Sequence, residues 1–125
     1  MTRPAHVVTL ADLATDRPMP RIERRRIIGE RMMISDVVLE PGFDLAPHRH
    51  ENEQFVVVLQ GRCVFGLGEA GTPEFREVEV RGGQVLVLPP NVWHSCRALE
   101  RTHIYDLFSP ISATTGVDAH AGATR

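Results

Sequence analysis

The sequence has 125 residues, 42% of them hydrophobic and 24% charged, with a formal net charge of −2 when histidine is neutral. This size and composition predict one folded domain with a single core rather than a disordered chain. Without a basic field to attract nucleic acid or an anionic membrane, a small molecule is the expected partner. All 14 basic side chains are arginine, which excludes chemistry that needs a lysine nucleophile or Schiff base.

No apolar stretch is long enough to indicate a secretory signal or a membrane-spanning helix, so we expect a cytoplasmic protein. The two cysteines, Cys63 and Cys96, are too few for a disulfide framework and lack the C-x-x-C spacing of zinc and redox motifs. We therefore expect reduced thiols that pack as small hydrophobic side chains.

The chain divides into three predicted segments. Residues 1–20 are expected to form an N-terminal arm, because Pro18 and Pro20 interrupt regular structure. Residues 113–125 are mostly small and polar without periodicity, which indicates a flexible tail. Residues 21–112 contain short β-branched runs separated by Gly, Pro and Asn, the pattern of an all-β sandwich or barrel. The predicted strands are 21–28, 31–39, 55–59, 62–67, 75–80, 84–88, 95–99 and 103–108.

Three histidines stand out as candidate metal ligands. Side chains two residues apart in a strand lie on the same face, so His48 and His50 are expected to point together, and Gln54 has the same parity. Neutral imidazoles suit Zn, Ni, Fe, Mn or Cu, although a single His-x-His pair is more often solvated surface. A second strand-turn-strand unit, with the turn Pro89-Pro90-Asn91, ends in His94 and supplies a third imidazole.

The spacings G-x5-H-x-H-x3-Q-x6-G at 42–61 and G-x5-P-x-N-x2-H at 83–94 resemble the paired signature of the cupin superfamily. The resemblance implies a cupin double-stranded β-helix, a jelly-roll barrel. Its interior would hold one divalent transition metal ion through His48, His50, Gln54 and His94. Cupins usually have Gly where Asn91 stands, and Asn is one of the few other residues that tolerate a positive φ.

The fourth ligand has two candidates. Cupins usually have Glu where Gln54 stands, and the neighbouring Glu53 could supply a carboxylate instead. Strict alternation turns Glu53 to the opposite face, which favours Gln54. A neutral amide ligand leaves the site more positive than three histidines with one Glu, and therefore a stronger Lewis acid.

A closer resemblance, over roughly residues 29–110, is to the KdgF type of cupin associated with pectin and alginate breakdown. It is carried by the segment 48–54, by the Pro-Pro-Asn turn and by the segment 98–110. KdgF-type enzymes open a 4,5-unsaturated uronate to a linear keto acid, with the Gln as a metal ligand. The resemblance implies that Asp106 is the general acid/base and that Phe108 faces the cavity as a substrate-binding residue, and their shared strand parity agrees with the inward direction.

One position departs from that type. An arginine that can bind the substrate carboxylate follows the Ser-Pro pair there, whereas this chain has Ser112. Arg24 and Arg26, from the run at 24–26, are candidates to bind the substrate instead, although such a run is also typical of a solvated surface.

Three functions remain open. The first is a metal-dependent enzyme that uses Lewis-acid and general acid/base chemistry on a small oxygenated substrate, by ring opening, isomerisation or cyclisation. The second is a metal-dependent dioxygenase. The third is a cupin that binds a small ligand without turnover. We also expect a homodimer through edge strands, with the N-terminal arm reaching a partner subunit.

Overall fold

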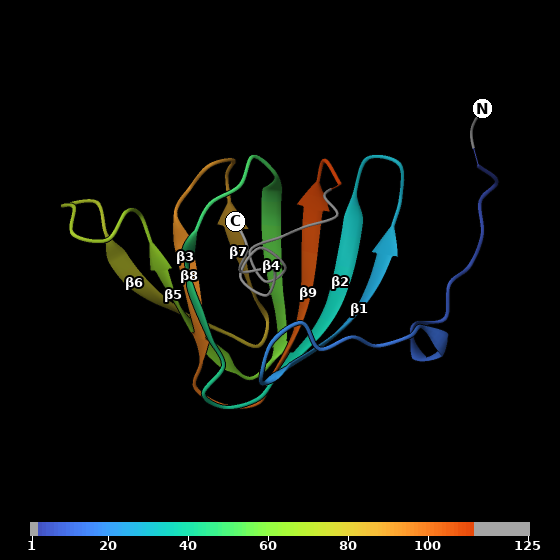
Figure 1. Cartoon of the computed structure of the whole chain (residues 1–125), viewed down its shortest axis with the longest axis horizontal. Coiled ribbons are helices and arrows are strands. Elements are labelled where there is room, and N and C mark those ends of the chain that lie inside the picture. The colour runs from blue at the N-terminus through green and yellow to red at the C-terminus, as the bar shows by residue number, and fades with distance from the viewer. Residues whose placement is uncertain (1–2, 112–125) are drawn as a thin grey trace.

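The structure is a computed structural model that describes residues 3–111, which form two antiparallel sheets facing each other as an open V (Figure 1). The five-stranded sheet has the order β1-β2-β9-β4-β7, and the four-stranded sheet has the order β3-β8-β5-β6. This is the all-β jelly roll that the sequence predicts. The strands are β1 (Ile22–Ile28), β2 (Met33–Leu39), β3 (Asp44–His48), β4 (Glu53–Gln60), β5 (Arg62–Leu67), β6 (Arg76–Arg81), β7 (Gln84–Leu88), β8 (His94–Ala98) and β9 (Thr102–Ser109).

The sequence analysis missed strand β3, and this omission changes how the histidine motif is arranged. His48 ends β3 in the four-stranded sheet, His50 lies in the connection that follows, and Gln54 lies on β4 in the other sheet. The expectation that all three share one strand face is therefore wrong. β3 is an edge strand that contains Pro47 and buries only one side chain, so its sequence carries little strand signal.

Alternation along the strands separates the barrel interior from the outer surface. In β2, every second side chain from Met33 to Leu39 is buried, as expected for a sheet with one face against the core. Register then sorts the interior into layers. We call one of them the core layer; it consists of Val37, Phe43, Val58, Cys63, Ala98 and Ile104, all buried.

The N-terminal arm contacts its own chain. Asp16 forms an isolated antiparallel bridge with Arg24, with backbone hydrogen bonds of 2.9 Å in both directions, and so pairs with the outer edge of β1. A 3-10 turn, η1 (Leu10–Asp12), precedes this contact. No helix among residues 3–111 is long and apolar enough to cross a membrane. The predicted tail at 113–125 and the last residue of the predicted domain lie outside the described residues.

Candidate metal site

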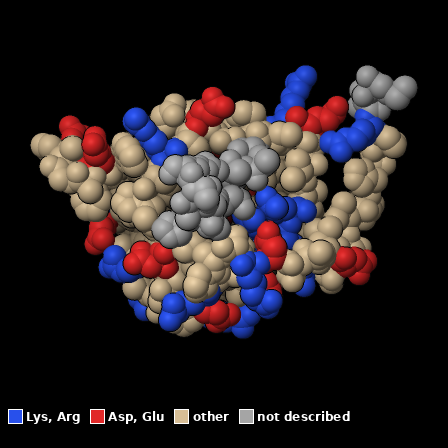
Figure 2. All heavy atoms as spheres, viewed as in Figure 1, with Lys and Arg blue, Asp and Glu red and all other residues tan. Residues whose placement is uncertain are grey.

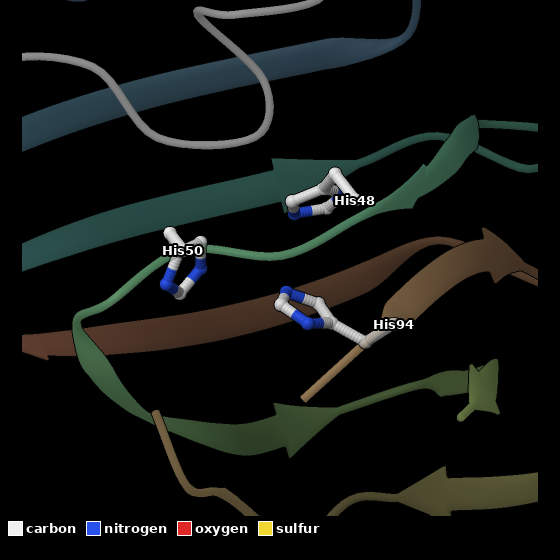
Figure 3. Close-up of side chains that lie close together, drawn as sticks. All are labelled: His48, His50 and His94. Carbon is white, nitrogen blue, oxygen red and sulfur yellow. The ribbon is translucent and has the colours of Figure 1, made fainter. Parts of the chain in front are cut away.

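The three histidines come together from three different segments. His48 and His94 are register partners on adjacent strands β3 and β8, and His50 approaches them from the β3–β4 connection (Figure 3). The ring centroids lie 4.2 Å apart for His48 and His94, and 5.1 Å apart for His50 and His94. One nitrogen of each ring lies within 4.8 Å of those of the other two. The predicted histidine cluster is therefore present, and it suits a divalent metal ion.

The backbone fixes the tautomer of each ring. Every Nδ1 contacts a carbonyl oxygen two residues away, and a carbonyl only accepts, so each Nδ1 carries the proton. The Nδ1 to carbonyl distances are 3.0 Å for His48 to Ala46, 3.0 Å for His50 to Asn52 and 2.8 Å for His94 to Val92. When such a ring is neutral, its Nε2 atom carries no proton and can act only as an acceptor. Metal-binding histidines have the same arrangement, in which the ring nitrogen that does not bind the metal is held by a hydrogen bond.

His94 provides the test of whether a metal fits. Its Nε2 is buried, and no hydrogen-bond partner reaches it among the residues that the structure describes. Burial, and next the neighbouring His48, lower the pKa of His94 to about 4, so the ring is neutral at physiological pH. A buried acceptor without a donor costs free energy, and a cation at this point removes that cost. The residues present therefore fit a metal ion.

Gln54 rather than Glu53 faces the cluster. Glu53 is exposed, whereas Gln54 is 7% exposed and its Oε1 lies 3.2 Å from Nε2 of His50. The Gln54 amide nitrogen donates to Oδ1 of Asp106 at 3.0 Å, which turns Oε1 toward the histidines. Both Oε1 and a bare Nε2 are acceptors, and two acceptors this close repel each other unless a proton or a metal ion lies between them.

Asp106 lies one register step deeper than Gln54, on the inner face of β9. Burial raises its pKa to about 6, against the opposing effects of the Gln54 hydrogen bond and the positive charge of Arg24. The amide of Gln54 thus links the carboxyl group to the histidine cluster, and Asp106 lines the same cavity as His48 and His94. This places a titratable carboxyl group beside the candidate metal site.

The cavity between the sheets encloses about 60 Å³. Its polar lining consists of His48, His94, Gln54 and Asp106, and the rest is apolar. The apolar lining residues are Ile22, Val37, Leu39, Phe43, Leu45, Val56, Phe65, Cys96, Ile104 and Phe108.

Other predicted site residues have different surroundings. Phe108 is 4% exposed, lines the cavity and packs edge-on against His50, with ring centroids 5.8 Å apart. Arg24, also buried, forms a paired salt bridge with Asp16 of the arm at 2.9 and 2.8 Å. Arg26 lies 3.7 Å from the same carboxylate. Neither arginine belongs to the cavity lining among the described residues, and their role in substrate binding stays a prediction.

Two asparagines that hold His50 in place were not predicted as site residues. The buried Asn52 accepts from Nδ1 of His50 through its carbonyl oxygen, and its side-chain amide donates to the carbonyl of Pro110. Asn91 adopts φ +64°, the positive value expected for this turn, and its N–H donates to the carbonyl of His50 at 2.8 Å. The position of Asn52 between two candidate ligands was the only sequence signal for its role.

The cysteine pair is buried, as expected. Contact with Cys63, and next burial, raise the pKa of the Cys96 thiol, so this cavity-lining group stays protonated. This agrees with a packing role.

Comparison with known proteins gives consistent results. The family described as "Cupin domain" matches residues 35–108. The structure is similar to KdgF from Halomonas sp., at 27% identity and a TM-score of 0.71, over 82% of this chain and 92% of that one. An RmlC-like cupin from Shewanella frigidimarina is 17% identical with a TM-score of 0.77, over 90% and 97% of the two chains, and shows the fold alone. Acireductone dioxygenase of Saccharomyces cerevisiae is 34% identical over 58 residues, which are 46% of this chain and only 32% of that relative.

Proposed function

Because this chain belongs to the cupin family, we propose that its site is that of a metal-dependent enzyme that moves a proton on a small oxygenated substrate. The supporting observation is the direct hydrogen bond from Gln54 to Asp106 beside three histidine rings with their Nδ1 atoms engaged. In that arrangement a carboxyl group lies near the histidine cluster, in a mostly apolar cavity. The reaction class is ring opening, isomerisation or cyclisation.

The proposed ligands are His48, His50, His94 and the Oε1 atom of Gln54. A divalent ion held there would supply Lewis-acid polarisation of a hydroxyl or carbonyl oxygen of the substrate. Three imidazoles and an amide carry no charge of their own, so this ligand set would leave the positive charge of such an ion undiminished. Asn52 and Asn91 hold His50 by backbone contacts and keep the ligand set in place.

Asp106 is the proposed general acid/base. Its carboxylate accepts a proton from the substrate and returns it to another substrate atom, which is the net change in a ring opening followed by tautomerisation. Phe108 packs against His50 and covers one side of the site, which limits access of water.

Replacing Asp106 tests this assignment. Zinc-loaded, manganese-loaded and nickel-loaded protein is incubated with a 4,5-unsaturated uronate and with simpler enol-forming substrates, and products are followed by NMR. Asp106→Asn is expected to lower kcat at least about 100-fold while the metal content stays at one ion per chain. Glu53→Gln, at the exposed neighbouring position, is the control and keeps full activity. Equal turnover by Asp106→Asn and the native chain would remove Asp106 from the mechanism.

A dioxygenase is the second candidate, favoured by the 58-residue similarity to acireductone dioxygenase. A three-histidine site with one neutral oxygen ligand leaves coordination positions for both substrate and dioxygen. Oxygen consumption by the iron or nickel form supports this candidate. Anaerobic turnover at an unchanged rate excludes it. A ligand that raises the melting temperature but yields no product, either by proton transfer or by reaction with dioxygen, favours a binding protein.

We also propose a homodimer through the outer face of the five-stranded sheet. Ile27, Ile34, Leu107, Phe55 and Val87 lie in register across all five strands and form a continuous apolar row on that face. Five strands about 4.8 Å apart and about six residues long give roughly 500 Å² per copy, so two copies bury about the minimum for a specific interface.

The face shown in Figure 2 mixes basic and acidic side chains, which favours small-molecule partners over nucleic acid.

Phe55→Glu tests the interface, since it buries a charge inside the row, next to its central residue Leu107. We expect the native chain to sediment as a dimer at micromolar concentration and the variant as a monomer. Phe75→Glu is the matched control, because Phe55 and Phe75 are both 38% exposed but Phe75 lies beside the other sheet. A monomeric native chain, or a dimeric Phe55→Glu variant, would contradict this interface.

A further inference from the structure

We propose that the substrate carries a small apolar group of about two or three carbon atoms, buried below the metal site, next to the oxygen-bearing group that reaches the histidines and Asp106. This inference rests on the proposed function and names the substrate class for the same site. It differs from the uronate expected from the KdgF resemblance, because a uronate ring bears hydroxyl groups on most of its carbons.

The first observation is the distribution of polar atoms in the cavity. Register places His48 and His94 in one row, and Cys96 with Leu45 in the next row deeper. On the opposite sheet, Gln54 is followed by Val56 at the level of Asp106. Beyond that level the lining is apolar: Val37, Leu39, Phe43, Ile104 and Ile22. Polar lining therefore occurs only beside the histidines and Asp106.

The second observation is what this deeper part offers to a ligand. Its lining has no hydroxyl, amide or guanidinium group among the described residues, and its single sulfur group is the thiol of Cys96. A substrate hydroxyl placed there would lose its hydrogen bonds to water and gain none, which costs binding free energy. An alkyl group placed there gains free energy by leaving water. The lining therefore selects against a polyhydroxylated group.

The third observation is size. An apolar cavity of about 150 Å³ accepts benzene, whereas the whole cavity here, its histidine end included, has a volume of about 60 Å³. In proportion, its apolar part has room for about two or three carbon atoms at most, and not for a ring. The side chains that bound it, such as Phe43 and Phe65, are themselves buried at 2% and 3% exposure, so the space is fixed by packing.

A series of ligands with one metal-binding head tests this. Alkyl hydroxamates with tails of one to four carbons are titrated into zinc-loaded protein, with affinity read by calorimetry and by melting shift. Each added methylene is expected to tighten binding about fourfold up to a tail of three carbons, and the fourth to give no gain. 2,3-Dihydroxypropanohydroxamate, the hydroxylated counterpart of the two-carbon tail, is expected to bind at least about tenfold more weakly than that tail.

Variants of the cavity wall locate the effect. Val56→Leu and, on a different strand, Val37→Leu fill the space and are expected to abolish the gain in affinity from longer tails. Val57→Leu, on the partly exposed outer face of β4, is the control and keeps the full series. An affinity that is independent of tail length, or equal binding of the dihydroxylated compound, would overturn the inference. Failure to bind zinc or any hydroxamate would instead count against the proposed function.

Discussion

The two ends of the barrel interior are built by the same strands but have opposite chemistry. The histidine end carries His48, His94 and Gln54, whereas the core layer two register steps away carries Ala98, Val58 and Ile104. His94 and Gln54 are buried like the core layer, whereas His48 is half-buried. The difference shows that the fold supplies inward positions, and that the row in which a side chain lies decides whether it can reach a metal ion. Variants in the two layers should therefore affect different measurements.

The largest expected effect belongs to the core layer. Phe43 is 2% exposed, and Phe43→Ala leaves a large void at the closed end of the barrel. We expect the free energy of unfolding to fall by about 3–5 kcal/mol, measured by urea denaturation. The metal stoichiometry of the folded fraction is expected to stay at one ion per chain, since no ligand has changed. Loss of metal from folded Phe43→Ala would show that the two layers are not independent.

At the histidine end, His94→Ala removes one proposed ligand and is expected to weaken zinc binding more than about 100-fold, by competition titration with a chelator. The same change removes a buried Nε2 atom that has no hydrogen-bond partner among the described residues. The free energy of unfolding of the metal-free chain should therefore change little. His103→Ala is the matched control, because His103 lies on the outer surface and pairs with Asp36 at 2.6 Å. Equal zinc affinity in both variants would remove the histidine cluster as the metal site.

A smaller effect is expected from the support of a ligand. Asn52→Ala deletes the side-chain hydrogen bond to Pro110 but keeps the backbone carbonyl that accepts from His50. The connection should loosen, and zinc affinity should fall about tenfold with little change in stoichiometry. Glu51→Ala, at the exposed neighbouring position, is the control. An unchanged affinity in Asn52→Ala would show that the backbone alone positions His50.

Much of the site could be predicted from the sequence, because the site residues stand at fixed distances along the chain from two turns. The histidine cluster, the inward position of Gln54, the positive φ of Asn91 and the shared face of Asp106 and Phe108 follow that pattern. The route to it was partly wrong, since His48 and Gln54 lie on different sheets. The sequence analysis predicted the inward direction of Gln54 by counting even steps from His48, as if both lay on one strand. The prediction was correct because Gln54, although on β4, also faces the interior.

The sequence by itself determined the strand-rich single domain and the residue types able to bind a metal, because strand periodicity and ligand chemistry are local properties. Only the tertiary structure decided that Arg24 faces Asp16 of the arm, and that Asp106 contacts Gln54 rather than solvent. It also decided that the space below the histidines is small and apolar. These features depend on which strands pair and on which rows of the two sheets meet, and such long-range contacts leave no periodic mark in the chain.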